Sequence, residues 1–208
     1  VWGLIMALIA LGLNLIFGLL HIINMAHGAL YMLGAVFSWY VIELTGNYWL
    51  ALFVAPLAVG LIGLALERGL LRTIADQPLV TIICTFGIML VLQQLVLTYF
   101  GGTARRIALP IPGRFPLFDL QYPVMRIVIA AISVAVMGGL WFFLNRTRYG
   151  LWVRAVVQDR EMAVALGIPL HKVYMWTFGL GSVLAACSGV LAAPIVSVDF
   201  MMGREILI

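Results

Sequence analysis

The sequence predicts an all-α, polytopic transmembrane helical bundle with one broken or re-entrant membrane segment. Of its 208 residues, 64% are hydrophobic and only 10% are charged, whereas soluble domains carry about 25% charged residues. The backbone in lipid must satisfy its own hydrogen bonds, so only helices and closed barrels can span a bilayer. Barrel strands alternate apolar and polar residues over about 10 positions. The long apolar runs here do not alternate, and this favours helices.

The first 42 residues predict the break, because they contain no Asp, Glu, Lys or Arg. As one helix they would span about 63 Å, roughly twice the thickness of the hydrocarbon core. Two membrane elements must therefore share this stretch. The natural point of division is its polar cluster, residues 21–28, with the sequence His-Ile-Ile-Asn-Met-Ala-His-Gly.

Later charge-poor runs are each long enough to span a membrane. The predicted segments lie near residues 2–20, 25–43, 48–66, 79–100, 126–145 and 173–196. The last run is rich in small residues, for which close helix packing is the commoner reason and a pore lining the alternative. These residues are Gly179, Gly181, Ser182, Ala185, Ala186, Ser188 and Gly189.

The connectors predict the orientation of the chain. Two spans separate residues 67–76 from residues 146–172, so these two connectors are expected on one side of the membrane. They carry seven basic residues: Arg68, Arg72, Arg146, Arg148, Arg154, Arg160 and Lys172. The connector between them carries four: Arg105, Arg106, Arg114 and Arg126. The larger number marks the cytoplasmic face.

The connector at 101–123 is expected to be a shaped extracytoplasmic loop. Its prolines exclude a continuous helix; they are Pro110, Pro112, Pro116 and Pro123. The chain as a whole is expected to form a single transmembrane domain, residues 1–208. Because both ends lie within apolar sequence, the chain is expected to be a fragment, truncated at the C-terminal end and also at the N-terminal end.

The net charge of +4 does not predict nucleic-acid binding, because the basic residues sit in short connectors rather than in a stripe. The expected surroundings are instead a lipid bilayer. Neither a cofactor nor a metal is predicted, since His21 and His27 lack neighbouring ligands. No Gly-Lys pair is present for a P-loop, and no catalytic constellation appears, so the chain is not expected to be an enzyme.

Residues 148–170 form a connector that is longer than two membrane helices need. Gly150 and the stop at 167–169 bracket a predicted helical stretch with a polar centre at 154–161. Such a segment can lie on the lipid headgroups or dock on another protein, and its spacing alone favours neither.

Within this segment, Glu161-x-Ala163-x-x-x-Gly167 resembles the core of the cytoplasmic EAA loop of bacterial ABC-importer permeases. Met162 replaces the second Ala of that pattern, and the later Ile-x-Leu-Pro portion is missing. More broadly, the chain resembles the permease subunits of branched-chain amino acid (LIV-type) importers, near the urea and short-chain amide branch. The stretches that carry this resemblance are 12–18 with 23–32, Glu67-Arg68, and 148–189.

The resemblance implies a multi-pass permease in the bacterial inner membrane that imports branched-chain amino acids or related amide- or urea-like solutes. It implies four kinds of partner: two ATP-binding subunits, a second homologous permease subunit, a periplasmic solute-binding protein and the lipid bilayer. The 148–170 loop would then dock on an ATPase. The expected coupling residues are Arg154, Asp159, Glu161, Ala163 and Gly167.

Asn24, His27 and Gly28 are the candidate residues of a solute path. Polar residues within membrane sequence tend to face a cavity or another helix, and transporters place helix breaks beside the substrate. The alternative is a tight turn in which Asn24 caps the next helix. The resemblance favours the path.

A secondary transporter or channel for a small solute is the main alternative function, since it would share broken helices and glycine-rich packing. A proton- or sodium-coupled carrier should hold an ionisable residue deep in a span. Residues 173–198 contain no Asp, Glu, Lys or Arg. An importer permease is therefore the function we expect.

Overall fold

The computed structural model describes residues 1–20, 24–74, 77–107, 113–117 and 120–205. Within these residues, six helical segments are long and apolar enough to cross a membrane. The long helices are α1 (Trp2–Leu20), α2 (His27–Thr45), α3 (Tyr48–Leu66), α5 (Pro78–Phe100), α6 (Val124–Arg146) and α9 (Leu170–Ala192). The prediction of an all-α, polytopic bundle is confirmed.

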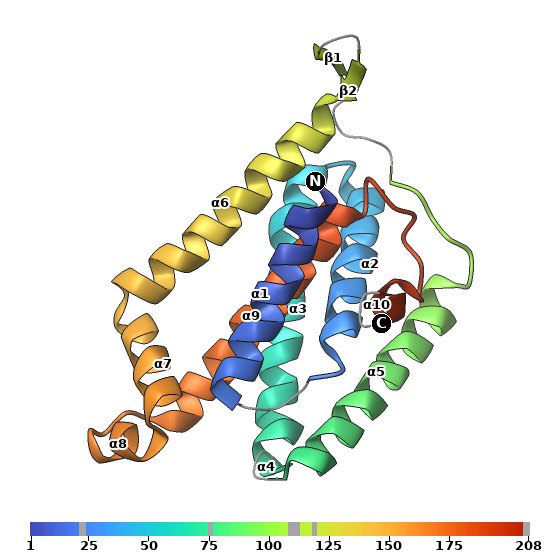
Figure 1. Cartoon of the computed structure of the whole chain (residues 1–208). Helices are drawn as coiled ribbons and strands as arrows, with labels where there is room; N and C mark the ends of the chain where they lie inside the picture. Colours follow the sequence, from blue (N-terminus) through green and yellow to red (C-terminus); the bar gives the residue numbers. More distant parts are fainter. Residues whose placement is uncertain (21–23, 75–76, 108–112, 118–119, 206–208) are drawn as a thin grey trace.

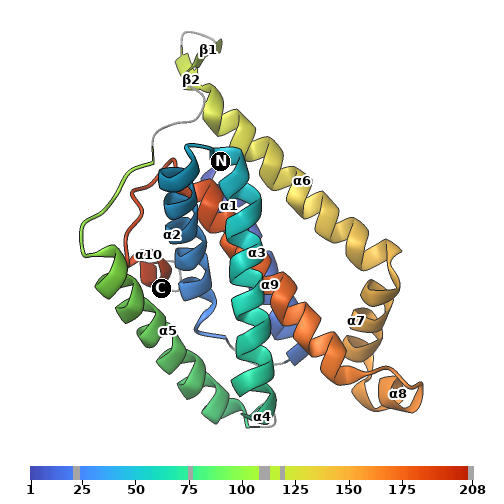
Figure 2. The same ribbon diagram turned by 180° about the vertical axis from the view of Figure 1, so that it is seen from behind.

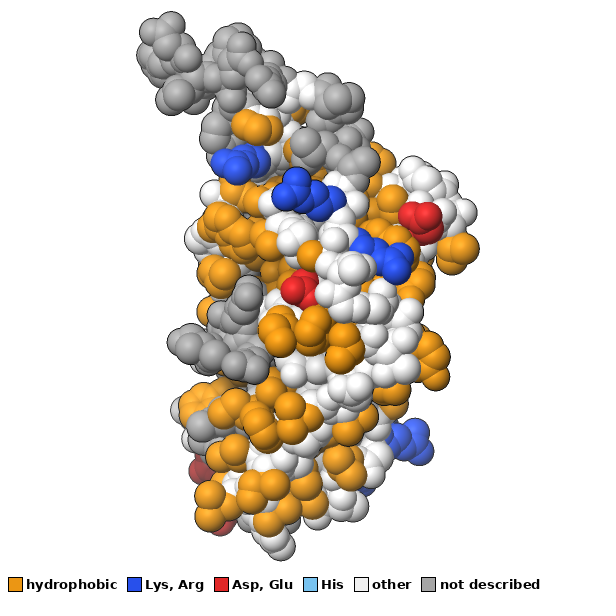
Figure 3. Space-filling model, turned by 90° about the vertical axis from the view of Figure 1, so that its right-hand side faces the viewer, with side chains coloured by type: hydrophobic (Ala, Val, Ile, Leu, Met, Phe, Trp, Pro, Cys, Tyr) orange, Lys and Arg blue, Asp and Glu red, His pale blue; other side chains and the backbone are white. Residues whose placement is uncertain are grey.

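Helix α9 lies at the centre of the bundle, against α1, α2 and α3 (Figures 1 and 2). Helices α5 and α6 flank this core on opposite sides (Figure 1). Their outer faces carry exposed apolar side chains such as Phe86 and Trp141. Seen from one side, hydrophobic side chains cover much of the surface, and most of the basic side chains in view lie in its upper half (Figure 3). This pattern suits a lipid surrounding.

Small residues let the central helices approach closely. A Cβ on Gly34 of α2 would lie 2.5 Å from the backbone of Ala186 in α9. A Cβ on Gly181 of α9 would lie 3.0 Å from the carbonyl oxygen of Gly12 in α1. The small residues of α9 therefore serve helix packing, which is the expected role of such residues between membrane helices.

The two ends of the bundle carry different connectors. Helices α7 (Arg148–Gln158), α8 (Arg160–Ala165) and α4 (Arg72–Ile74) lie at one end, and the β1–β2 hairpin lies at the other (Figure 1). The predicted grouping of the 67–76 and 146–172 connectors on one side is therefore confirmed. Strands β1 (Arg114–Leu117) and β2 (Leu120–Pro123) pair antiparallel within the predicted proline-rich loop.

Three boundaries differ from the prediction. Helix α3 continues through a π-helical turn, η1 (Glu67–Leu71), into α4, so the expected connector at 67–76 is mostly helical. Helix α9 begins directly after Pro169 and includes Lys172 in its first turn. The single helix expected over 151–167 is wrong, because α7 ends at Gln158 and α8 starts at Arg160.

The segment after α9 pairs with the residues that follow the C-terminal end of α5. Arg105 and Val198 exchange two backbone hydrogen bonds, at 2.9 and 2.7 Å. The Arg105 guanidinium stacks 4.2 Å from the centroid of the Trp39 ring and donates to the carbonyl oxygen of Phe100. From this attachment the chain returns into the bundle as α10 (Met202–Glu205), beside α2 (Figure 1).

Candidate functional site

The predicted break lies between α1, which ends at Leu20, and α2, which begins at His27. Residues 21–23 lie outside the described part of the chain. The turn that follows is stabilised by Asn24, whose Oδ1 accepts a hydrogen bond from the backbone N–H of Ala26 at 3.1 Å. The N–H of Met25 donates to Oγ1 of Thr85 in α5 at 3.3 Å. The backbone freed by the break is thus partly satisfied by side chains, as burial requires.

His27 shows how deep this break lies. Its Nε2 donates to the carbonyl oxygen of Ile9 at 3.1 Å; a carbonyl can only accept, so the proton is on Nε2. Ile9 stands near the middle of α1, about 16 Å from the Leu20 end at the helical rise of 1.5 Å per residue. Helix α2 therefore begins inside the bundle, beside the middle of α1, rather than at its end.

Two polar atoms at the break have no hydrogen-bond partner among the described residues. They are Nδ2 of Asn24 and Nδ1 of His27, both buried. Buried polar groups are normally paired, so each unpaired one needs an explanation. Asn24 does not cap α2, whose N-cap is Ala26 and lacks a side-chain hydrogen bond. Asn24 instead holds the turn that directly precedes α2, through its hydrogen bond from the N–H of Ala26.

Helix α10 packs against the start of α2, next to the break between α1 and α2. A Cβ on Gly203 would overlap the carbonyl group of Gly28, so α10 and the start of α2 touch through their backbones. The structure thus brings Asn24, His27 and Gly28 together, all buried, and adds Thr85 and Gly203 from distant parts of the chain. Sequence reasoning missed the last two, because a threonine in an apolar run and one glycine carry no distinctive signal.

The 148–170 connector forms two short helices against one end of the bundle. The buried face of α7 packs against α1 and α9; this cluster contains Leu19, Val153, Val156, Ala163 and Val173. Asp159 separates α7 from α8, and its Oδ1 accepts from the N–H of Met162 at 2.9 Å. An aspartate in this position is a favourable N-cap and a barrier to one continuous helix.

Helix α8 ends at a left-handed residue. Gly167 has φ of +77°, and the N–H of Ile168 donates to the carbonyl oxygen of Ala163 at 3.0 Å. This is a Schellman-type stop, for which glycine is the favoured residue. Ala163 itself is 1% exposed. Ala163, one of the expected coupling residues, is therefore packed within the chain's own core.

The other candidate coupling residues lie on the surface. Arg154, Asp159, Glu161 and Gly167 are exposed; Arg154 Nη1 donates to Oδ1 of Asn145 at 3.2 Å. Apolar side chains are exposed beside them, and sequence reasoning had not singled these out. They are Leu151, Val157, Met162, Val164 and Leu166, each at least 47% exposed.

Within the described residues, no group of three or more His, Cys, Asp or Glu side chains is arranged to hold a metal ion. Cys84 and Cys187 are not disulfide-bonded. The chemistry that the broken helix offers is hydrogen bonding in a buried setting.

Comparison with known proteins places these features in context. Residues 1–206 match the family model described as branched-chain amino acid transport system / permease component. The chain is 30% identical over 200 residues to the high-affinity branched-chain amino acid transport system permease protein BraD of Pseudomonas aeruginosa, covering 89% of this chain and 65% of BraD. It is 32% identical over 221 residues to the corresponding protein LivH of Salmonella typhimurium, covering 96% of this chain and 71% of LivH.

A more distant relative is the putative glucose ABC transporter permease protein TsgC13 of Haloferax volcanii, 28% identical over 81% of this chain and 53% of TsgC13. The chain thus spans about two thirds of BraD and about half of TsgC13. No solved structure matches the chain.

Proposed function

Because the chain belongs to the family of branched-chain amino acid transport permease components, we propose that it is the membrane-spanning subunit of an ATP-driven importer. Its solutes are branched-chain amino acids or related small amide- or urea-like molecules. It carries no ATP site of its own and works with two ATP-binding subunits, a second homologous permease subunit and a periplasmic solute-binding protein. The complex resides in the bacterial inner membrane.

The observation that carries this proposal is the position of the broken helix. The hydrogen bond between His27 and Ile9 sets the start of α2 beside the middle of α1. Transporters use such discontinuous helices where a solute crosses, because the freed backbone and nearby polar groups can bind it. The unpaired Nδ2 of Asn24 and Nδ1 of His27 supply such groups here. Asn24, His27 and Gly28 border the solute path.

Helices α7 and α8 receive the ATPase. Leu166 is 71% exposed beside four other exposed apolar side chains of this connector, a feature typical of a protein interface. Asp159, Glu161 and Arg154 supply orienting polar contacts, worth about 1 kcal/mol each at a partly wet interface. Ala163 does not contact the ATPase itself; because it is buried, it holds α8 against the bundle and so positions the docking surface. Gly167 turns the chain out of α8.

The test is reconstitution of the protein with two ATPase subunits, the second permease and the solute-binding protein of the proposed complex. Proteoliposomes that enclose ATP on the cytoplasmic side should accumulate radiolabelled L-leucine when loaded binding protein is added. A matched complex with catalytically inactive ATPases is the control and should not accumulate it. Accumulation driven by a proton or sodium gradient without ATP would overturn the proposal in favour of a secondary transporter.

A further inference from the structure

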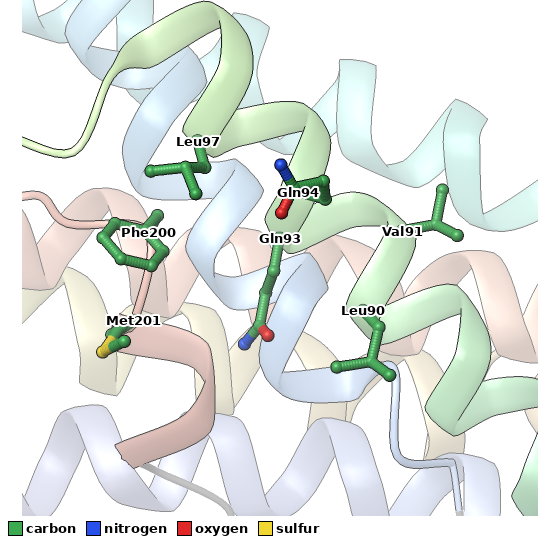
Figure 4. Close-up of a pocket in the computed structure, with 7 residues that line it drawn as sticks. All are labelled: Leu90, Val91, Gln93, Gln94, Leu97, Phe200 and Met201. Atoms are coloured by element: carbon green, nitrogen blue, oxygen red, sulfur yellow. The ribbon is translucent and has the colours of Figure 1, made fainter.

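A cavity of about 370 Å³ lies between α5 and the segment that leads into α10 (Figure 4). This volume falls within the range of about 300–1,000 Å³ typical of small-molecule sites. Its walls come from two parts of the chain: Leu90, Val91, Gln93, Gln94 and Leu97 of α5, and Phe200 and Met201. Five of these seven side chains are apolar.

The cavity adjoins the broken helix. On α5, Gln93 lies about two turns beyond Thr85, whose hydroxyl holds the N–H of Met25 at the break. On the other wall, Met201 directly precedes α10, which touches the start of α2. The elements that form the two walls of the cavity, α5 and the segment leading into α10, therefore also contact the residues of the break.

Gln93 carries an unsatisfied donor at this cavity. Its side chain extends from α5 toward the segment that carries Met201 (Figure 4). The Nε2 atom is buried and has no hydrogen-bond partner among the described residues. A buried amide donor left unpaired is costly, so a ligand that supplies an acceptor is favoured there.

Asp199 carries an unsatisfied acceptor one residue from the cavity wall. Its Oδ1 is buried and makes no hydrogen bond in the described part of the chain. It directly precedes Phe200, which lines the cavity. A carboxylate in such a position favours a cationic donor. The Gln93 amide therefore favours a hydrogen-bond acceptor on a ligand, whereas the Asp199 carboxylate favours a donor.

We propose that this cavity binds an aliphatic α-amino acid during transport. Gln93 donates to the carboxylate of the amino acid, Asp199 accepts from its ammonium group, and the apolar walls surround its aliphatic side chain. This inference rests on the proposed import function and selects among its solutes. Urea has no aliphatic side chain and no charged pair to fill the site, and a sugar would set hydroxyls against Leu90, Leu97 and Phe200.

The complete transporter, reconstituted as above, tests this with L-leucine and urea as probes. Gln93→Leu should lower the rate of leucine uptake about fivefold or more, the effect of one lost hydrogen bond to a charged group. Asp199→Asn should lower it similarly. The matched control is Gln77→Leu, because Gln77 is exposed before α5 and its side chain makes no cap hydrogen bond. It should transport normally.

A second measurement, protection of a cysteine by substrate, tests the site even if the variants above fold poorly. With Cys84 and Cys187 replaced by Ala, Gln93→Cys should react with a small thiol reagent. Turnover of leucine-loaded binding protein should slow that reaction. Normal uptake by Gln93→Leu and Asp199→Asn, with no protection of Gln93→Cys, would overturn the inference while ATP-driven leucine uptake by the unmodified complex still supports the importer. ATP-driven uptake of urea but not leucine would overturn the amino-acid assignment alone. Uptake of neither would overturn the import function on which the inference rests.

Discussion

Gly189 of α9 lies so close to the carbonyl oxygen of Tyr31 in α2 that a Cβ on Gly189 would overlap it. The same Cβ would also lie 3.0 Å from the backbone nitrogen of Ala35. Both neighbours are backbone atoms, so no change of rotamer can make room. The contact fixes how near the axes of α2 and α9 can come.

We therefore expect Gly189→Ala to push α2 away from α9. Overpacking of this kind commonly costs about 1–3 kcal/mol, which corresponds to a fall of about 5 °C in the midpoint of thermal unfolding. The measurement is thermal unfolding of the purified protein in detergent. Gly138→Ala on α6 is the matched control, because a Cβ there meets no atom within 4 Å. Equal midpoints for both variants would show that the α2–α9 contact is not close.

His27→Ala should destabilise the break between α1 and α2. The substitution removes the hydrogen bond to the carbonyl of Ile9 and empties a fully buried site, at a cost of about 2 kcal/mol or more. The same thermal measurement checks it. His171→Ala is the control, since His171 is exposed in the first turn of α9. If the two variants unfold at the same temperature, the His27 bond does not hold α2 at mid-depth.

Leu166→Asp should weaken binding of the ATPase subunits without disturbing the membrane core. The side chain is 71% exposed, so a charge there is tolerated by the permease and opposed only by an apolar partner surface. Co-purification of ATPase should fall several-fold, while Leu166→Met should retain it. Gly167→Trp should act in the same direction, because a φ of +77° strongly favours glycine and strains a bulky residue.

Normal co-purification and coupled transport by Leu166→Asp and Gly167→Trp would contradict the docking role. Such a result would favour the other interpretation of this segment, a helix resting on the lipid headgroups. The variant Ala163→Trp distinguishes the packing of α8 on the bundle from direct contact with the ATPase. Because Ala163 is buried, we expect that variant to lower thermal stability as well as ATPase binding.

The orientation of the bundle predicts which ends are open to reagents from outside. Gly113 precedes β1 and Gln158 ends α7, so they lie at opposite ends of the bundle, and both are exposed. In a variant without Cys84 and Cys187, Gly113→Cys should react with a membrane-impermeant thiol reagent added to intact spheroplasts. Gln158→Cys should react only after the membrane is opened. The reverse pattern would invert the topology.

Much of the fold could be predicted because lipid imposes simple rules. Long apolar runs had to be helices, and α3 spans the expected residues 48–66. The boundaries that failed depended on single residues with local effects. Asp159 caps α8 and so divides a helix that its flanking residues favour. From Glu67 to Leu71 a π-helical turn continues the helix, although the charged residues there had predicted a connector between two membrane segments.

The candidate site was predictable only where polar residues stand out from apolar sequence. Asn24 and His27 stood out in this way, and both lie buried at the break. Gln93 did not, because its significance comes from packing between α5 and a segment about a hundred residues later. Whether a side chain has a hydrogen-bond partner depends on tertiary packing. An unpaired amide therefore cannot be recognised from the sequence.

The central position of α9 has a consequence for the biosynthesis of the protein. Helices α1, α2 and α3 surround α9, yet about a hundred residues separate the end of α3 from its start. At about 5–20 residues per second, the ribosome needs roughly 5 to 20 seconds to make that stretch. During this interval the three early helices wait in the bilayer with their close-packing surfaces unmatched, and only the late arrival of α9 gives them a common partner.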